Sequence, residues 1–325
     1  MRVAILGATG AVGRTMLRVL EERAFPAEEV VLLASPRSDG QRLVWRGREW
    51  PVRTPEPGCF RGCAVALFSA GAERSREWAP RAAAEGAVVV DNSSAWRMDP
   101  QVPLVVPEVN ARRIAERPRG IVANPNCVTI QLVLALEALR RAAGLVRVVA
   151  SSYQSVSGAG ARGIAALRAE LAGEVAPETP FPARIAGNLI PAIGAFRPGG
   201  WTEEEEKIRS ETRKILELPD LAVAATCVRV PVEVGHAVSA TVELERPLAL
   251  AEAVAALRAM PGLDVVESGP GPQPLEVAGQ DRVCVGRVRM DPDFPRVLHF
   301  WVVGDNLRKG AATNAVQIAE RVVRG

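Results

Sequence analysis

Several residue types and patterns are scarce in this sequence, and each scarcity excludes a class of function. Its 325 residues include only two histidines and one tyrosine, aromatic residues make up 4%, and the net charge is only +3. So small a charge, spread without a basic run, does not favour a nucleic-acid or membrane partner. No apolar stretch approaches the ~20 residues that a membrane-spanning helix requires. A globular protein that acts on small molecules remains as the expectation.

Cysteine is present, but in a number that argues against disulfides. The five cysteines are Cys59, Cys63, Cys127, Cys227 and Cys284. An odd number, in a chain whose first residues MRVAILGATG carry no secretion signal, predicts a cytoplasmic protein without a disulfide framework. The pair Cys59 and Cys63 could suggest a metal site. Only two histidines could join this pair, and no second cysteine pair completes four ligands, so we predict no metal.

The first half of the chain alternates short apolar runs with helix-like stretches. The runs are RVAIL (2–6), VVLLAS (30–35), VALFSA (65–70), AVVVDNS (87–93) and GIVANPN (120–126). Continuous β-branched runs of this kind suit strands that are buried on both faces. They predict an α/β fold with a doubly wound parallel sheet.

From about residue 146 the pattern changes to longer, partly alternating segments, which predict a second, α+β domain with a mixed or antiparallel sheet. Residues 161–220 are punctuated by proline and glycine, and their weak periodicity leaves individual elements undefined. The last stretch, from Asn306, has apolar positions at helical spacing and could return to the first domain. We therefore predict a first domain of residues 1–127 plus 306–325 and a second domain of residues 128–305.

The glycines of GATGAVG lie between the first predicted strand and a helix-like run. Gly7, Gly10 and Gly13 would let the backbone turn tightly and approach a pyrophosphate, which the helix N-terminus also attracts. A strand-to-helix turn without a ligand is the alternative interpretation. The position at the start of the chain, with further parallel-type strands behind it, favours dinucleotide binding.

The residues after the second predicted strand indicate which dinucleotide is bound. An NAD-preferring site usually carries an acid at this point, whereas this chain has Pro36, Arg37 and Ser38. A guanidinium beside a hydroxyl suits a 2′-phosphate through charge-assisted hydrogen bonds. Arg37 could also be an ordinary solvated turn residue, but the pattern favours NADP over NAD.

Cys127 has the most informative surroundings of the five cysteines, because it follows a strand-breaking Asn-Pro-Asn and precedes a strongly helical run. A helix N-terminus stabilises a thiolate, which is the nucleophilic form of cysteine. A buried cysteine is more commonly inert packing. The turn context nevertheless makes Cys127 the candidate nucleophile.

Histidine is scarce enough to narrow the search for a proton-transfer group. His236 lies at a junction between a loop and a predicted strand, whereas His299 lies within the apolar run VLHFWVV. A histidine at a junction can face a cleft, and one in the middle of a strand is more commonly structural. His236 is therefore the candidate acid/base residue.

At this point several motifs together resemble one family, the aspartate-semialdehyde dehydrogenases. The motifs, in chain order, are GATGAVG, the Arg37-Ser38 pair, SAG at 69–71, DNSSAWR at 91–97, NPNC at 124–127, YQSVSGAG at 153–160, EEEEK at 203–207, RVPVEVGH at 229–236 and GDNLRKGAA at 304–312. Dispersed motifs in the right order are more specific than any single one. The resemblance implies an N-terminal Rossmann domain, a C-terminal catalytic and dimerisation domain, and a homodimer or a dimer of dimers.

The resemblance also implies roles for individual residues. It makes Cys127 the nucleophile, Gln154 the residue that orients a thioester intermediate, and His236 the acid/base. Around the substrate it implies Arg97 and Lys207 for the phosphate, Arg229 for the α-carboxylate, Glu204 for the α-ammonium, and Asn126 beside them. The implied NADP contacts are Gly7, Thr9, Gly10, Ala11, Val12, Gly13, Arg37, Ser38, Ser69, Gly71, Ser157, Gly158 and Asn306.

Some of these roles have competing explanations in the sequence itself. Glu204 and Lys207 are three residues apart and would share one face of a helix, where they could hold an ammonium and a phosphate. Thr202 and Glu205, however, form a capping-box pattern, so part of the acidic run is structural, and the register of the run is uncertain by one residue. Gln154, at a predicted strand end, could be ordinary surface.

The resemblance implies NADPH-dependent reduction of L-aspartyl 4-phosphate to L-aspartate 4-semialdehyde and inorganic phosphate, in the biosynthesis of lysine through diaminopimelate, threonine, methionine and isoleucine. The nearest alternative is N-acetyl-γ-glutamyl-phosphate reductase, whose substrate has no free ammonium and would not need an acid at Glu204. A catalytically silent NADP-binding regulator is the alternative from another class.

Overall fold

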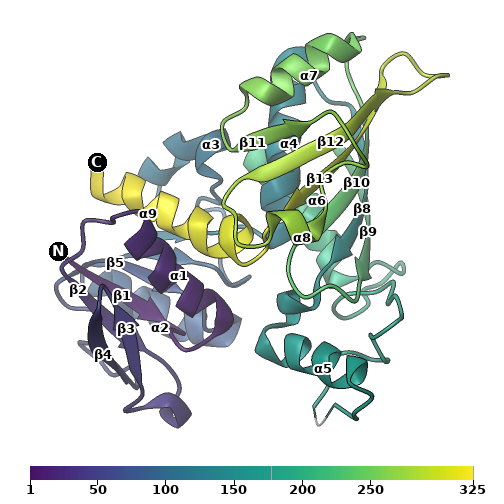
Figure 1. Cartoon of the computed structure of the whole chain (residues 1–325). Coiled ribbons are helices and arrows are strands. Elements are labelled where there is room, and N and C mark those ends of the chain that lie inside the picture. The colour runs from purple at the N-terminus through teal and green to yellow at the C-terminus, as the bar shows by residue number, and fades with distance from the viewer. Residues whose placement is uncertain (177, 325) are drawn as a thin grey trace. The chain divides into compact units, whose positions relative to one another are not determined.

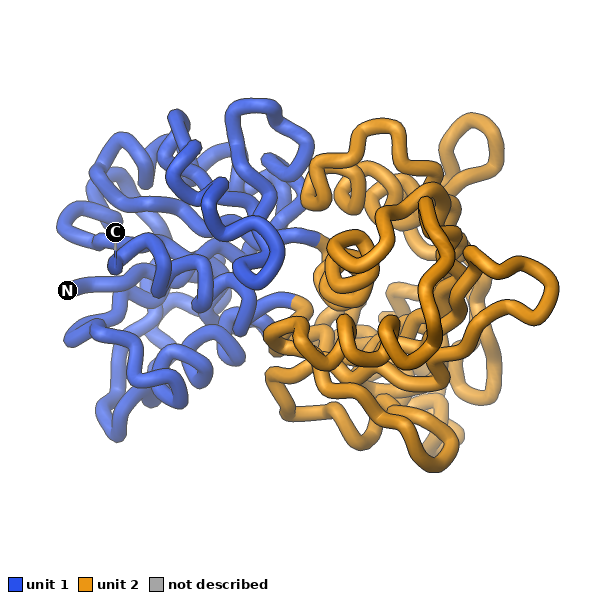
Figure 2. Tube along the Cα trace, turned by 90° about the horizontal axis from the view of Figure 1, so that it is seen from above, with its two compact units in different colours: residues 1–125, 311–325 blue, residues 126–310 orange. Residues whose placement is uncertain are grey.

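The computed structural model describes residues 1–176 and 178–324, and the chain divides into two compact units (Figures 1 and 2). Unit 1 contains residues 1–125 and the C-terminal residues from Ala311 on, and unit 2 contains residues 126–310. Asn126 and Cys127 therefore belong to unit 2, whereas the predicted boundary placed them in the first domain. The return to unit 1 also comes later than predicted, at Ala311 instead of Asn306.

Unit 1 is built on a seven-stranded sheet with the order β3-β4-β2-β1-β5-β6-β7. Its strands are β1 (Arg2–Leu6), β2 (Glu29–Leu33), β3 (Arg42–Trp45), β4 (Arg48–Arg53), β5 (Cys63–Phe68), β6 (Val88–Asp91) and β7 (Ile121–Ala123). Its α-helices are α1 (Ala11–Glu22), α2 (Ala72–Ala84), α3 (Pro107–Asn110) and α9 (Thr313–Arg324). The parallel pairing of β2, β1, β5, β6 and β7 confirms the doubly wound sheet predicted from the apolar runs.

The hairpin of β3 and β4 was not predicted. Both residues of its tight turn, Arg46 and Gly47, have positive φ, at 51° and 71°, which is the backbone of a primed hairpin turn. Asparagine or glycine usually occupies the first position, so Arg46-Gly47 does not form a recognisable turn motif. Arg46 is held there because its guanidinium donates to the carbonyls of Ala27 and Phe25 at 2.6 and 2.7 Å.

Unit 2 contains a six-stranded mixed sheet with the order β11-β12-β13-β10-β8-β9. Its strands are β8 (Arg147–Gln154), β9 (Ala222–Arg229), β10 (His236–Glu243), β11 (Leu263–Val266), β12 (Val283–Met290) and β13 (Val297–Gly304). Its α-helices are α4 (Cys127–Ala143), α5 (Ala161–Leu171), α6 (Glu203–Leu216), α7 (Leu250–Ala259) and α8 (Pro274–Val277). The mixed sheet confirms the predicted α+β domain, although the short strand β11 was not anticipated.

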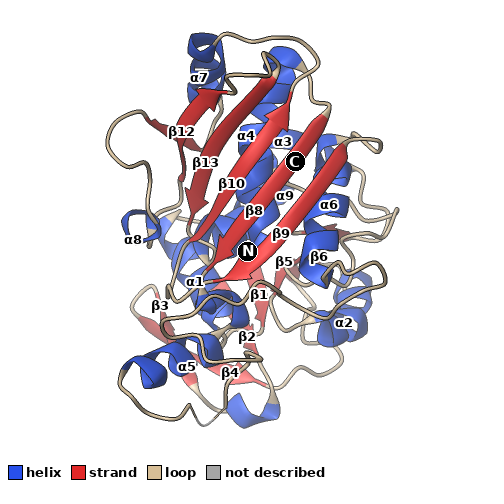
Figure 3. Ribbon diagram, turned by 90° about the vertical axis from the view of Figure 1, so that its right-hand side faces the viewer, coloured by secondary structure: helices blue, strands red, loops and turns tan. Residues whose placement is uncertain are grey.

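Three longer helices of unit 2 gather on one face of this sheet, and the short helix α8 packs against β13 on the other face, where Val277 clusters with Tyr153 and Trp301. Helix α4 packs against β10 and β13, α6 against β9, and α7 against β11 and β12. Figure 3 shows the sheet with α4 and α6 behind it. On the facing side, side chains such as Val149, Tyr153 and Trp301 remain partly exposed. Among the described residues, no helix combines the length and apolar character needed to span a lipid bilayer.

Candidate active site

The glycine loop of unit 1 has the geometry of a phosphate cradle. Gly7 has φ +91°, and a Cβ there would lie 2.4 Å from the carbonyl oxygen of Ser69. A Cβ on Gly13 would lie 2.1 Å from the carbonyl oxygen of Gly7, so neither position accepts a side chain. Gly10 precedes α1 without a side-chain cap, and the helix starts with Ala11 and Val12. The first-turn N–H groups of α1 can therefore serve a bound anion.

A cavity of about 300 Å³ lies beside this loop, and four of the predicted cofactor residues, Gly7, Thr9, Gly10 and Ser69, form part of its walls. Its lining residues are Leu6, Gly7, Thr9, Gly10, Ala34, Ser35, Pro36, Thr54, Pro55, Ser69, Ala70, Arg74 and Trp78. The glycine-lined wall next to a helix N-terminus is typical of a dinucleotide site, and the volume suits one part of such a ligand.

The predicted 2′-phosphate residues stand at the edge of this cavity. Ser38 contacts the hydroxyl of Thr9 at 3.2 Å, and Arg37 is exposed in the short 3₁₀ turn after β2. Arg74, which was not predicted, lines the cavity, whereas Arg37 directly follows a lining residue and is not itself part of the lining. Arg74 belongs to the first turn of α2, directly after Gly71 (φ +86°). The helix start behind the SAG motif was the signal that could have found it.

Arg97, also in unit 1, is fixed by backbone carbonyls. Its Nε donates to the carbonyl of Asn124 at 3.0 Å and its Nη2 to the carbonyl of Asn92 at 2.8 Å. Nearby Asp91 is buried and accepts from the N–H and the hydroxyl of Ser93. Burial raises the pKa of Asp91, while the bonds from Ser93 and the charge of Arg97 oppose that rise. Arg97 is thus a buried, preorganised cation.

In unit 2, Cys127 is the first residue of α4, as predicted. Asn126 is the N-cap, and its side-chain oxygen accepts from the N–H groups of Val128 and Thr129 at 2.9 and 3.3 Å. Gly310 passes so close that a Cβ there would lie 3.1 Å from the Cβ of Cys127. The thiol therefore stands at a capped helix N-terminus, which favours a thiolate.

Burial distinguishes the other four cysteines from a nucleophile. It raises the pKa of Cys59, Cys63 and Cys284, and it raises the pKa of Cys227 to about 12. A thiol with a raised pKa carries little thiolate near neutral pH. No group of three or more potential metal ligands gathers within residues 1–176 and 178–324.

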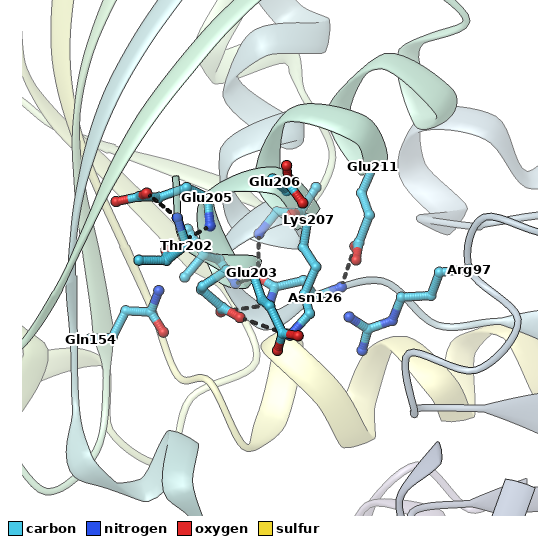
Figure 4. Close-up of polar contacts among 12 residues, drawn as sticks. Arg97, Asn126, Gln154, Thr202, Glu203, Glu205, Glu206, Lys207 and Glu211 are labelled. Carbon is cyan, nitrogen blue, oxygen red and sulfur yellow. Dashed lines mark hydrogen bonds and ion pairs between the residues drawn. The ribbon is translucent and has the colours of Figure 1, made fainter. Parts of the chain in front are cut away.

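Two buried carboxylates of α6 hold Asn126, and Figure 4 shows one of them, Glu211, pointing toward it. Glu204 accepts from the side-chain Nδ2 of Asn126 at 2.7 Å, and Glu211 accepts from its backbone N–H at 2.6 Å. The two acids are seven residues apart, so they lie on one face of the helix. The sequence analysis missed Glu211. The heptad spacing from Glu204 was the available signal, but nothing in the sequence indicated its target.

The structure also separates the roles of the acidic run. Glu203 pairs with Arg197 near the surface, and Glu205 completes the predicted capping box with Thr202, which confirms that part of the run is structural. Glu205 also accepts from the backbone N–H of Cys227 at 3.1 Å. Glu204 is the acid that contacts Asn126, and its second oxygen lies 3.3 Å from the Nζ of Lys207.

His236 is fully buried at the start of β10. Its Nδ1 accepts from the backbone N–H of Ser155 at 3.0 Å, and its Nε2 has no hydrogen-bond partner among the described residues. Burial, followed by the charge of Arg229, lowers the pKa of His236 to about 3. The ring is therefore neutral at pH 7. His299, by contrast, contacts Thr241 and Asp291 through its two nitrogens, as a structural histidine does.

Arg229 lies at the end of β9, next to His236. Its Nη1 donates to the carbonyl of Ser155 at 2.7 Å. Burial lowers the pKa of Arg229, whereas Cys127 and Glu204 act on it in the opposite direction. A Cβ on Gly158 would lie 2.7 Å from Nη1 of Arg229 and 3.3 Å from Nε2 of His236, so a side chain at this position would displace the guanidinium of Arg229.

Gln154 and two predicted cofactor residues complete the buried polar group of unit 2. Gln154 pairs with Arg229 in the β8–β9 register and is 1% exposed, so its interpretation as ordinary surface is wrong. Its Nε2 donates to Ser152 at 3.1 Å. Ser157 and Asn306 are buried and joined by a 2.9 Å hydrogen bond. Their contact with the nicotinamide half stays a prediction.

Taken together, unit 2 offers a cysteine at a helix N-terminus, a buried arginine, and a neutral histidine with one nitrogen that no described residue contacts by a hydrogen bond. Glu204 forms an ion pair with Lys207 and also accepts a hydrogen bond from Asn126, the residue before the cysteine. Such a set can form and break a covalent acyl bond on sulfur. Unit 1 separately offers a dinucleotide cradle.

Two family models together cover most of the chain. Residues 2–117 match a semialdehyde dehydrogenase NAD-binding domain, and residues 136–309 match a semialdehyde dehydrogenase dimerisation domain. The chain is 50% identical to an aspartate-semialdehyde dehydrogenase of Aquifex aeolicus, over 99% of this chain and 98% of that one. It is 45% identical to the Bacillus subtilis protein of the same name, over 98% and 96%. The crystal structure of Vibrio cholerae aspartate semialdehyde dehydrogenase II complexed with ASA superposes with a TM-score of 0.97, at 47% identity over 99% of this chain and 98% of that one.

Proposed function

This chain belongs to the aspartate-semialdehyde dehydrogenase family of NADP-dependent oxidoreductases, and on that premise we propose Cys127 as the nucleophile of its catalytic cycle. The reaction is the reduction of L-aspartyl 4-phosphate to L-aspartate 4-semialdehyde and phosphate. It serves the biosynthesis of lysine, threonine, methionine and isoleucine. The observation that carries the proposed mechanism is the position of Cys127 directly after Asn126, which Glu204 and Glu211 hold in place.

In the proposed first step the Cys127 thiolate attacks the acyl carbon. The carbon–sulfur bond forms, the carbon–oxygen bond to the phosphate breaks, and a thioester remains on the enzyme. Lys207 and Arg97 bind the phosphate as it leaves. Arg229 pairs with the α-carboxylate, for which a buried guanidinium is well suited. Glu204 receives the α-ammonium, and Gln154 orients the thioester.

The glycine loop, Thr9, Arg37 and Ser38 would hold NADPH, which supplies the hydride when bound. Addition of this hydride would turn the thioester into a tetrahedral adduct whose former carbonyl oxygen is an alkoxide, the anion of a thiohemiacetal. His236, which matches the family's acid/base residue, then acts on the former carbonyl oxygen. The carbon–sulfur bond breaks, and the aldehyde is released. The last step therefore returns Cys127 to its thiolate.

The deciding experiment is the phosphate-dependent, NADP-linked oxidation of aspartate semialdehyde. Activity is expected with phosphate and should disappear when phosphate is omitted. The Cys127→Ala variant should have no turnover, and measurable aldehyde-dependent NADPH formation by this variant would remove the covalent mechanism. N-acetylglutamate semialdehyde is the matched comparison, because it lacks the ammonium expected at Glu204. A preference for that substrate would favour the alternative reductase.

We also infer a homodimer that uses the face of the unit 2 sheet opposite helices α4 and α6, which only the short helix α8 covers in part among the described residues. Tyr153 and Trp301 pack with ring centroids 5.3 Å apart on this face, and Val149 on the same face is 38% exposed. A partly apolar sheet face is stabilised by a second layer. Light scattering after gel filtration should give twice the chain mass of 34.6 kDa, and a dimer of dimers would give four times that mass. The cytoplasm is the expected compartment.

A further inference from the structure

The two ring nitrogens of His236 have unlike surroundings, and this difference fixes the position of the ring proton. The backbone N–H of Ser155 points at Nδ1 at 3.0 Å, and a backbone hydrogen cannot turn away. Nδ1 must therefore act as an acceptor and carries no proton. In the neutral ring the proton then resides on Nε2, the nitrogen without a partner among the described residues.

The neighbours of His236 stabilise this ring without a carboxylate. The hydroxyl of Ser155 lies 3.0 Å from Nδ1 and 3.0 Å from Oδ1 of Asn306, and it can rotate to donate to either. Asn306 is held in turn, because its Oδ1 accepts from the backbone N–H of Gly235 at 2.9 Å. Ser155 also binds Arg229 through its carbonyl. One residue thus positions both His236 and Arg229.

The charges around His236 also disfavour an imidazolium. Arg229, at the end of the neighbouring strand β9, is the charged group that acts on the ring. Cys127 on α4 and Glu204 on α6 act on Arg229. On the turn after β13, the carboxylate of Asp305 accepts backbone N–H groups, which come from Gly279, Leu307 and Arg308.

We propose that His236 acts as a neutral hydrogen-bond donor through Nε2–H, and that Ser155 and Asn306 are the positioning residues that hold it in this tautomer. The proposal rests on the proposed function and refines the acid/base role within it. When hydride adds to the thioester carbon, the carbonyl oxygen becomes an alkoxide and accepts the Nε2–H bond. The alkoxide reforms its carbonyl as the carbon–sulfur bond breaks, and the electron pair returns to Cys127 as a thiolate. No proton is transferred between His236 and the oxygen in these two steps, so no imidazolium is needed.

Glutamine can reproduce this arrangement, which gives a direct test. In His236→Gln, the side-chain oxygen can accept from the Ser155 N–H while the amide NH₂ donates in the place of Nε2–H. We expect His236→Gln to retain a kcat at least about tenfold above that of His236→Ala, since a donor to a developing oxyanion contributes about 10²–10³-fold in kcat. Circular dichroism and urea unfolding would show that both variants fold. Equal loss of kcat in two folded variants would overturn the proposal.

A second readout does not depend on activity. Because the chain has only two histidines, ¹⁵N-histidine labelling gives a spectrum that the His299→Gln variant assigns. We expect a pyridine-type Nδ1 and a pyrrole-type Nε2 for His236, unchanged from pH 8 to pH 5. A protonated Nδ1, or an imidazolium in that range, would refute the inference. If the wild-type protein failed to oxidise aspartate semialdehyde, the proposed function would fall while this spectrum still tested the tautomer.

A positioning variant completes the experiment. Ser155→Ala removes the rotating hydroxyl and keeps the backbone N–H, so the tautomer should persist while kcat falls about tenfold and KM stays unchanged. Loss of the His236 tautomer in this variant would mean that the hydroxyl, and not the backbone, sets the proton position. That result would contradict the inference.

Discussion

Glu211 allows a sharp test of how the nucleophile is positioned. The proposed change is Glu211→Gln, which preserves the side-chain volume and one acceptor oxygen but removes the charge. Glu211 is 1% exposed and accepts from the backbone N–H of Asn126 at 2.6 Å. A hydrogen bond to a charged group contributes about 1.5–3 kcal/mol and a neutral one about 0.5–1.5 kcal/mol. The free energy of unfolding should therefore fall by about 1–1.5 kcal/mol.

The same change should reach Cys127, because Asn126 precedes it and caps its helix. If the weaker contact also raises the free energy of the transition state, kcat falls by up to about tenfold, since 1.4 kcal/mol corresponds to a factor of ten. KM for aspartate semialdehyde should change little, because Glu204 and Arg229 are retained. Urea unfolding measures the stability, and mass spectrometry of the Cys127 peptide measures its rate of alkylation by iodoacetamide.

Glu203→Gln is the matched control, because it removes the same charge from the same helix. Glu203 is partly exposed and pairs with Arg197 near the surface, where an ion pair contributes about 0–1 kcal/mol. Stability and alkylation rate should stay close to those of the wild type. If Glu211→Gln behaved like Glu203→Gln in both measurements, the clamp on Asn126 would have no role in positioning Cys127.

Three further predictions concern other parts of the site. Gly158→Ala would place a Cβ 2.7 Å from Nη1 of Arg229, so KM for aspartate semialdehyde should rise at least about tenfold, and an unchanged KM in steady-state kinetics would contradict the close approach. Arg37→Ala should raise KM for NADPH more than KM for NADH, because only the former carries the 2′-phosphate, whereas equal effects would assign Arg37 to the solvent. Because the pKa of His236 falls from 6.5 to about 3 on folding, the unfolded chain binds the extra proton between these values, and stability should drop as pH falls below about 6.5. Below pH 6.5, His236 should lower the free energy of unfolding by about 1.4 kcal/mol per pH unit. Urea unfolding at pH 7 and pH 5 should therefore show a larger loss of stability for the wild type than for His236→Gln. Equal losses in the two proteins would refute the lowered pKa of His236.

Local patterns were sufficient for the elements that carry the site. The apolar run before GATGAVG predicts β1, and Asn-Pro-Asn before a helical run predicts a cysteine at a helix start, because strand burial and helix capping depend on neighbouring residues. The capping box of Thr202 and Glu205 was readable for the same reason.

Contacts between distant segments could not be read from these patterns. Glu211 is 85 residues from Asn126, and only the packing of α6 beside α4 brings them together. Gln154 looked exposed because strand ends usually are, and its burial depends on β9 beside it. The tautomer of His236 depends on one backbone N–H, 81 residues away.

Because Lys207 and Glu204 form an ion pair, the substrate site favours a ligand that carries both a phosphate and an ammonium. The substrate brings an ammonium for Glu204 and a phosphate for Lys207, so under the proposed roles it exchanges one ion pair for two. A ligand with only the phosphate would draw Lys207 away and leave Glu204, which is 7% exposed, without its ion pair and bonded to the neutral amide of Asn126. A ligand with only the ammonium would displace Lys207 without giving it a partner. The single turn of α6 therefore responds to the two groups jointly and discriminates against either one alone.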